Sequence, residues 1–184
     1  YDACYLPNKK VMAVSNVGYQ GVPCVGGSDA VGNMMLYNPD DRNLRRLTFD
    51  QDANWHPVVM NNGRLMYVRW EYTDLTHYFS RMVMHMNPDG TEQRMLYGSG
   101  SVFPNSIFDV QPIPHHPTRF IGIISGHHGV VRSGRLIIFD PAISRNEEKG
   151  MIREIPFSKR PIVPMVKDDL VGGVYPQFIK PYPV

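Results

Sequence analysis

The chain has 184 residues, a formal charge of +2, 42% hydrophobic residues and 11% aromatic residues. Aromatic side chains in this number must be buried, which excludes a disordered chain. Lysine and arginine are scattered along the chain, so we expect no nucleic-acid partner. No apolar run reaches the roughly 18 residues of a membrane helix, so we expect no membrane span. Sixteen glycines and sixteen prolines leave little room for long helices and favour short strands.

Short apolar segments alternate with turn sequences along the whole chain. Several segments are apolar at nearly every position, which is typical of strands that are covered on both faces. Asn38-Pro39-Asp40, Asn61-Asn62-Gly63 and Asn87-Pro88-Asp89 lie between such segments and predict tight hairpins. We therefore expect an all-β fold.

The turn sequences recur in a fixed order, about 50 residues apart. Asn38-Pro39-Asp40 recurs as Asn87-Pro88-Asp89 and, less closely, around Asp140-Pro141. Trp55-His56-Pro57 has counterparts that end in Pro104 and Pro176. Such a period, with four short strands per unit, is typical of β-propeller blades. In the alternative fold, a β-sandwich, the turns would not repeat in this order.

The repeat predicts a partial β-propeller with about three four-stranded blades and the first strand of a fourth. Blade one spans about residues 1–50, blade two 51–98 and blade three 99–158, and the fourth begins within 170–184. Propellers typically close with four or more blades, so we expect a fragment of a six- or seven-bladed propeller. The expected strands are 2–6, 11–15, 33–37, 45–49, 55–60, 65–70, 81–86, 94–97, 105–112, 120–125, 135–139, 151–155 and 175–181.

The amino-acid sequence of the repeat resembles two groups of known propellers. Leu47-Thr48, Asp52, Trp55, Asn62-Gly63-Arg64 and residues 86–90 are similar to TolB-like and WD40-like repeats. More specific are four segments that together resemble the propeller domain of hydrazine synthase alpha-subunit-like proteins, over nearly the whole chain: residues 19–27, 69–74, 77–81 and 125–129.

The resemblance implies the middle domain of a large exported protein, periplasmic or extracellular. Its expected partners are other domains of the same chain, other subunits or a small ligand. It also implies c-type haem in other domains of the parent. The chain itself lacks the attachment pattern of two cysteines followed by histidine, so we expect no cofactor within it.

The two cysteines, Cys4 and Cys24, lie twenty positions apart. The resemblance to exported proteins favours a disulfide that ties the first strand to the loop at 16–32. The alternative is a pair of buried free thiols, as in a reducing compartment.

One rim of the propeller carries the unusual side chains. In this fold the connections between blades and those between the second and third strand of each blade lie at the same end, which we call the funnel face. Here they are long and contain Trp, Glu, Tyr and paired His, which simple turns do not need. We therefore expect a ligand- or partner-binding surface; alternatively, these loops only seal neighbouring blades. They are residues 16–32, 50–54, 71–80, 98–101 and 126–134.

The first candidate group is Asp50, Asp52 and Asn54, spaced like the first ligands of a calcium-binding loop. Trp55 replaces the glycine and Asn61 the final glutamate of such a loop. We therefore favour carboxylates that accept hydrogen bonds from backbone amides of the next blade.

The densest polar-aromatic group follows the sixth expected strand. Its carboxylates would suit a cation, and its tyrosine or histidine would suit iron or another metal. Alternatively, Arg69 or Arg81 forms a structural lock with a carboxylate. The group consists of Arg69, Trp70, Glu71, Tyr72, Asp74 and His77.

The histidines form the third group. His127 and His128 are adjacent, and adjacent side chains of an extended strand point to opposite faces, so the pair is poorly placed to chelate one metal. One of them together with His56 could do so, with Asp52 as a further weak metal candidate. We expect His115 and His116 to be solvated and His85 to be packed.

The residues identify no catalytic group. The leading hypothesis is a binding or scaffold module. The alternatives are part of a c-type-haem redox enzyme whose active site this face lines, and the propeller domain of an exported serine peptidase.

Overall fold

The computed structural model describes residues 1–71, 81–98, 106–126, 132–146, 148–156, 173 and 175–184. They form three four-stranded antiparallel sheets, each with its strands in chain order. The first sheet contains β1 (Cys4–Tyr5), β2 (Val11–Ser15), β3 (Asn33–Asn38) and β4 (Asn43–Arg46). The second contains β5 (Asn54–Val59), β6 (Leu65–Trp70), β7 (Arg81–Met86) and β8 (Arg94–Tyr97). The third contains β9 (Ile107–Pro112), β10 (Phe120–Ile124), β11 (Arg135–Phe139) and β12 (Met151–Ile155).

The expected all-β fold is confirmed, and the strands follow the sequence pattern closely. The helical elements of the described residues are two short 3-10 turns, η1 (Pro23–Val25) and η3 (Glu148–Gly150). The outer strand β4 ends at Arg46, earlier than expected. Beyond its end the Leu47 amide still donates to the Met34 carbonyl at 2.8 Å, but the Met34 amide donates to the Thr48 hydroxyl oxygen at 2.9 Å, so a side chain replaces the reciprocal backbone bond. No helix among the described residues is long and apolar enough to span a membrane.

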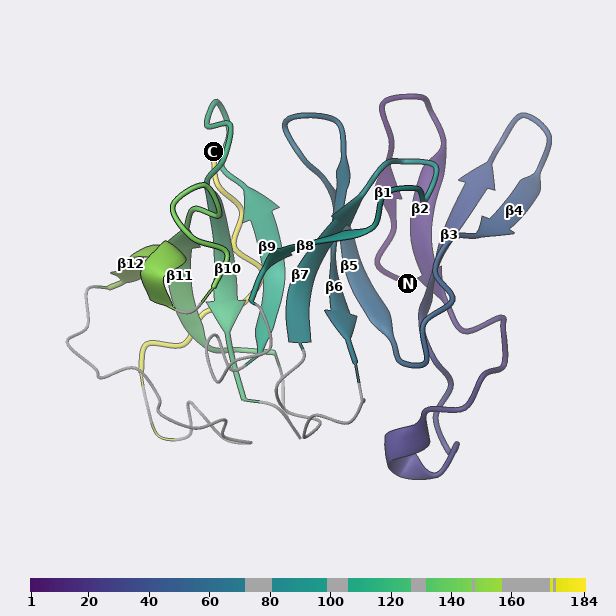
Figure 1. The fold of residues 1–184 in the computed structure, drawn as a ribbon, viewed down its shortest axis with the longest axis horizontal. Helices are drawn as coiled ribbons and strands as arrows, with labels where there is room; N and C mark the ends of the chain where they lie inside the picture. The colour runs from purple at the N-terminus through teal and green to yellow at the C-terminus, as the bar shows by residue number, and fades with distance from the viewer. Residues whose placement is uncertain (72–80, 99–105, 127–131, 147, 157–172, 174) are drawn as a thin grey trace.

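The second sheet is buried on both faces, because it lies between the other two (Figure 1). In β6, Leu65 and Tyr67 pack into the core shared with the first sheet, whereas Met66 packs into the core shared with the third. In β7, Met84 packs into the core shared with the first sheet and Val83 into the core shared with the third. Alternation along a strand sends successive side chains to opposite faces, so a strand that serves two cores must be apolar at nearly every position.

The connections separate into two ends of the molecule (Figure 1). The turns after β1, β3, β5 and β9 lie along one edge, which we call the hairpin face. The long connection 16–32 and the connection 47–53 lie at the opposite edge, the funnel face. The first strands of the three sheets pack against one another, since β5 contacts both β1 and β9. This arrangement brings equivalent positions of the three sheets together near one axis.

The segment expected to open a fourth blade contains no strand within its described residues 175–184. Phe178 forms an isolated antiparallel bridge with Gly134, next to β11 of the third sheet. The two residues exchange backbone hydrogen bonds of 2.9 and 3.0 Å. The C-terminal segment is therefore fixed to the third sheet, and a fourth blade stays a prediction.

The expected disulfide between Cys4 and Cys24 is not formed, because both are free thiols. Cys4 packs against the core between the first and second sheets, whereas Cys24 packs with Val22, Val31 and Trp70 on the funnel face. The two side chains thus belong to separate apolar clusters. Burial raises the pKa of the Cys4 thiol to about 11, so the thiol stays protonated at neutral pH.

We expect both cysteines to be free in the purified protein and Cys4 to react slowly with iodoacetamide at neutral pH. The reason is that the reactive species is the thiolate, which a raised pKa suppresses. Peptide mass spectrometry after alkylation without reductant measures both properties. A peptide pair linked through Cys4 and Cys24 would contradict the expectation, and alkylation after unfolding, which should modify Cys4 fully, is the control.

Candidate functional site

A histidine and two carboxylates meet where the first strands of the three sheets converge. His56 of β5 lies between Asp2, which precedes β1, and Asp109 of β9. Its Nε2 is 3.3 Å from Asp109 Oδ1 and 3.6 Å from Asp2 Oδ2. The His56 amide also donates to Asp2 Oδ2 at 3.4 Å. One imidazole thus joins carboxylates from the two flanking sheets.

The same three residues share an unusual backbone conformation. Asp2, His56 and Asp109 have φ of 50°, 53° and 49°. The pairing register shifts at His56 and at Asp109, which marks an irregularity of the bulge type in β5 and β9. A left-handed φ outside glycine costs about 1–3 kcal/mol, and Asp and His are among the residue types that adopt it more often. Lys180, in the C-terminal segment, has a similar φ of 45° and also precedes a proline, as His56 does.

Beside these residues lies an aromatic–arginine cluster of Trp55, Trp70, Phe108, Arg81 and Arg132. The two indole rings stack at 14° with centroids 6.2 Å apart. The Arg81 guanidinium carbon is 5.5, 5.3 and 5.6 Å from the ring centroids of Trp55, Trp70 and Phe108. The Arg132 guanidinium carbon is 4.2 Å from the Phe108 centroid.

Strand register explains why the cluster forms. Trp70, the last residue of β6, pairs directly with Arg81, the first residue of β7. Trp55 pairs with Val68, two positions before Trp70, so both indoles lie on the same face of the sheet. The sheet therefore sets an arginine beside two stacked rings before any ligand is present.

The two arginines are held in a partly dry environment. Arg81 is only 6% exposed. The pKa of Arg132 is lowered, first by burial, with the nearby Asp109 carboxylate opposing the shift. A desolvated guanidinium over an aromatic face gains about 2 kcal/mol from cation–π attraction. Burial and aromatic contact together hold these cations in place without removing their positive charge.

The cluster lines a cavity of about 380 Å³ on the funnel face. One wall comes from the long connection 16–32, and the other comes from the second sheet and Arg132. Two arginines and a single carboxylate, that of Asp29, line it, so the charged groups among its described residues sum to a positive value. The lining residues are Asn16, Val22, Cys24, Val25, Asp29, Ala30, Ala53, Trp55, Trp70, Arg81 and Arg132.

A separate lock holds the connection that precedes β5. Arg69 forms ion pairs with Asp50 and with Glu71, whose Oε1 lies 3.4 Å from Arg69 Nε. Asn54 Nδ2 donates to Asp50 Oδ2 at 3.0 Å, and the Asn54 amide donates to the Gly32 carbonyl of the first sheet's long connection. The arginine–carboxylate lock predicted for Arg69 and Glu71 is confirmed, and Asp50 joins it.

The calcium-like spacing thus has a structural use. Asp50 binds Arg69 and Asn54, while Asp52 and Asn54 are 1% and 0% exposed. Within the described residues no group of three or more His, Cys, Asp or Glu side chains is placed to hold a metal ion. The structure therefore does not support a metal role for Asp52 or His56 with these residues.

The structure divides the predicted site residues into three sets. His56 and Trp70 lie in or beside the aromatic–arginine cluster, and Asp50, Asp52, Asn54, Arg69 and Glu71 belong to the lock and its buried surroundings. The remaining ones lie outside the described residues: Tyr72, Asp74, His77, His127 and His128.

Sequence reasoning missed Asp2, Phe108, Asp109 and Arg132 as site residues, and placed Arg81 only in a lock. In the structure Phe108-Asp109 of β9 occupies the position of Trp55-His56 in β5, and Asp2 lies just before β1, so the sequence repeat, which aligned Pro57 with Pro104, did not point to these residues. Arg132 lies in the connection before β11, where no repeat fixes its position.

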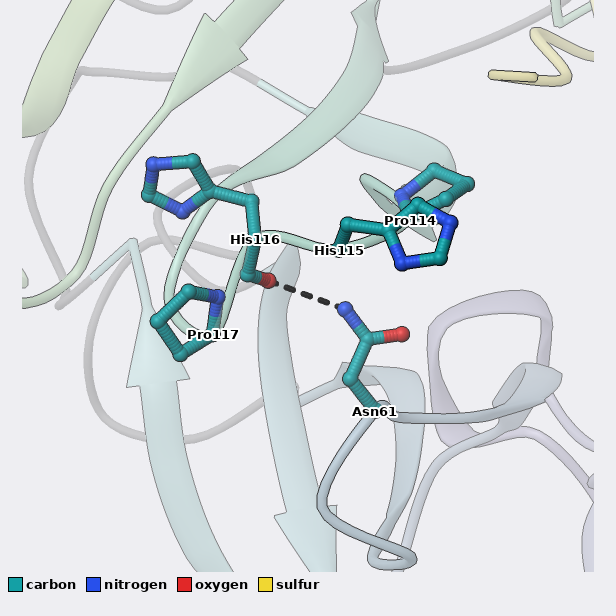
Figure 2. Close-up of a pocket in the computed structure, with 5 residues that line it drawn as sticks. All are labelled: Asn61, Pro114, His115, His116 and Pro117. Atoms are coloured by element: carbon teal, nitrogen blue, oxygen red, sulfur yellow. Dashed lines mark hydrogen bonds between the residues drawn. The ribbon is translucent and has the colours of Figure 1, made fainter.

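The hairpin face has a hollow of about 500 Å³ around His115, His116 and Asn61 (Figure 2). Asn61 Nδ2 donates to the carbonyls of Ile113 and His116, each at 2.9 Å, and prolines flank the two histidines. Figure 2 shows the two imidazoles pointing away from each other. His115 is exposed, as expected, whereas His116 is half-buried and its Nδ1 has no hydrogen-bond partner among the described residues, so the expectation of a solvated side chain holds for His115 alone.

No protein-family model and no curated protein matches the sequence. Among solved structures, the chain is similar to the tricorn protease, a β-propeller protease, with 12% identity and a TM-score of 0.51. The match covers 88% of this chain and 13% of that chain, so the chain spans a small part of that protein. Together with the three sheets, this likeness shows a propeller-like fold.

We expect Arg69→Gln to lower the free energy of unfolding by about 3 kcal/mol, because it removes the cation with which the largely buried Asp50 carboxylate pairs. Arg94→Gln removes the same charge from an exposed pair with Glu92 and should cost about 0.5 kcal/mol. Chemical denaturation monitored by circular dichroism measures both. Equal losses in the two variants would show that the lock is no stronger than a surface ion pair.

Proposed function

We propose that the chain is a binding module of a larger protein and that its funnel face takes up a ligand at the aromatic–arginine cluster. The observation that carries the proposal is the 380 Å³ cavity whose walls combine two stacked indoles with two arginines. Ligand sites are concave, mostly apolar and supplied with a few fixed polar groups, and this cavity has each property.

The chemistry of the walls indicates the class of ligand. Indole faces favour a planar or aromatic group, and guanidinium groups favour a carboxylate or another anion. Val22, Val25, Ala30 and Ala53 supply apolar surface between them. We infer a small aromatic anion, or the same chemical group presented by a partner domain.

The kind of larger protein that contains the module is inferred from the sequence resemblance alone. On that basis we propose an exported parent similar to hydrazine synthase alpha-subunit-like proteins, with any c-type haem in its other domains. The alternative in which this face lines the active site of such a haem enzyme shares the same cavity. Haem attachment motifs elsewhere in the parent chain would favour it.

To test the binding proposal, para-nitrobenzoate serves as an aromatic anion and its uncharged analogue para-nitrobenzamide as the matched probe. Calorimetric titration of the full-length protein should show saturable binding of the first and at least about tenfold weaker binding of the second. Arg132→Gln should weaken para-nitrobenzoate binding about tenfold, since a charge-assisted hydrogen bond contributes about 1.5–3 kcal/mol. Trp55→Leu should weaken binding of both probes.

The controls are Asn38→Ala and Asp89→Ala, two turn residues of the hairpin face that should leave binding unchanged at equal folded fraction. The result that would overturn the proposal is equal loss of binding in hairpin-face and funnel-face variants. If Arg132→Gln weakens binding of para-nitrobenzoate and para-nitrobenzamide equally, the inference that the ligand is an anion is wrong, although the proposed binding site itself still stands.

A second candidate is the propeller domain of a larger peptidase, and the likeness to the tricorn protease favours it. The sequence contains no Ser-His-Asp order with a nucleophile elbow, so we expect peptide hydrolysis to need another domain. We expect the full-length protein to cleave a fluorogenic peptide library only if such a domain follows. Inactivation by a serine-directed phosphonofluoridate would support this candidate, and intact peptides after prolonged incubation would exclude it.

A further inference from the structure

Another cavity, independent of the proposed function and distinct from the hollow around His115, lies on the hairpin face between the second and third sheets. Its volume is about 200 Å³. Buried apolar side chains of Met60, Leu96 and Phe120 form part of its lining, and the polar residues include His85 and Arg145. The turns after β5, β9 and β11 supply most of the lining: Asn62, Pro117, Thr118, Pro141, Ala142 and Arg145.

His85, in the middle of β7, is one of the lining residues, and a hydrogen bond fixes its tautomer. Arg64 Nε donates to His85 Nδ1 at 2.8 Å, so Nδ1 carries the lone pair and the proton of the neutral ring sits on Nε2. Within the described part of the chain, this buried Nε2 has no hydrogen-bond partner. An unsatisfied buried donor costs about 1–3 kcal/mol, which a bound acceptor would recover.

The ring stays neutral at physiological pH because its pKa is lowered to about 4. Burial is the main cause, followed by repulsion from Arg64, Arg145 and Arg94, while Glu92 opposes the shift. Three guanidinium groups therefore act on one imidazole, and they make its surroundings positive.

The carboxylates near the cavity already have partners within the protein. Glu92 pairs with Arg64 and Arg94, each at 3.3 Å. Asp140 lies 3.7 Å from Arg119 and accepts a hydrogen bond from the Thr118 hydroxyl. These contacts leave the cavity lining without a carboxylate of its own.

Arg145 differs from the other two arginines. Its backbone carbonyl accepts from the Gly98 amide at 3.0 Å, but within the described residues its guanidinium forms no ion pair or hydrogen bond. It lines the cavity together with His85, and it is exposed, so it can reach a ligand from solvent. Asn62 Oδ1 accepts from the Arg64 amide at 3.1 Å, which leaves its NH2 group as a further donor.

We propose that this cavity binds an oxyanion, the phosphate or carboxylate group of a small molecule. The His85 Nε2–H and the Arg145 guanidinium are its donors, and Asn62 assists. The apolar part of the lining would contact the body of the same molecule. An anion here satisfies the buried donor and compensates the unpaired guanidinium at the same time.

Calorimetric titration of the full-length protein at pH 7 with inorganic phosphate and, separately, with acetate tests the proposal. We expect saturable binding of at least one of them, weakened about tenfold by Arg145→Gln and by His85→Leu. Binding of phosphate alone assigns a phosphate ligand, and binding of acetate alone assigns a carboxylate. Absence of binding by both would overturn the proposal.

Arg94→Gln is the matched control, because it removes the same charge from the same group of arginines without lining the cavity. We expect it to change affinity less than about twofold. A loss equal to that of Arg145→Gln would mean diffuse electrostatic attraction and would overturn the site. Should His85→Leu unfold the protein, His85→Gln keeps a donor and the fold, and it should retain more than half of the wild-type affinity.

Discussion

Burial of both faces of the second sheet is the constraint on which the rest of this structure depends. Leu65 and Tyr67 point into one core and Met66 into the other, so neighbouring sheets cannot separate without exposing apolar surface. Fully burying one large apolar side chain gains about 1.5–3 kcal/mol, which exceeds the contribution of a typical exposed ion pair. The packing also fixes the sheets around a common axis, which places their loops at only two ends.

The first strands of the three sheets, which pack against one another, also place polar side chains close together. A bulge-like irregularity with left-handed φ recurs at His56 and Asp109, and Asp2 has the same φ. Such irregularities redirect a side chain and interrupt pairing, so they turn polar groups toward the axis rather than into the cores. Packing of the sheets compensates the backbone cost of about 1–3 kcal/mol at each position. The polar groups near the axis thus share a backbone conformation that recurs once in each sheet.

Sequence patterns were sufficient for most strands, with the limits of β4 and the expected strand at 175–181 as exceptions, but only partly for the site. Hairpin turns such as Asn87-Pro88-Asp89 have a local chemistry that determines their conformation, so strand limits followed from them. The lock around Arg69 was predicted because its partner Glu71 is close in sequence. Arg132 reaches Phe108 only through the packing of connections that share no repeat. The disulfide prediction failed for a similar reason: the resemblance suggested a compartment, whereas separate apolar clusters hold the two thiols.

The two cavities illustrate how one fold can place similar charges in different chemical settings. On the funnel face, Arg81 and Arg132 lie over aromatic rings, which stabilise a cation without neutralising it. On the hairpin face, Arg145 lies in a lining without indoles, beside a neutral imidazole that can only donate from Nε2. On the two proposals, the ligand of the first setting would carry a planar group together with charge, and that of the second an acceptor alone. Ligand shape would then distinguish the two proposed sites more strongly than ligand charge.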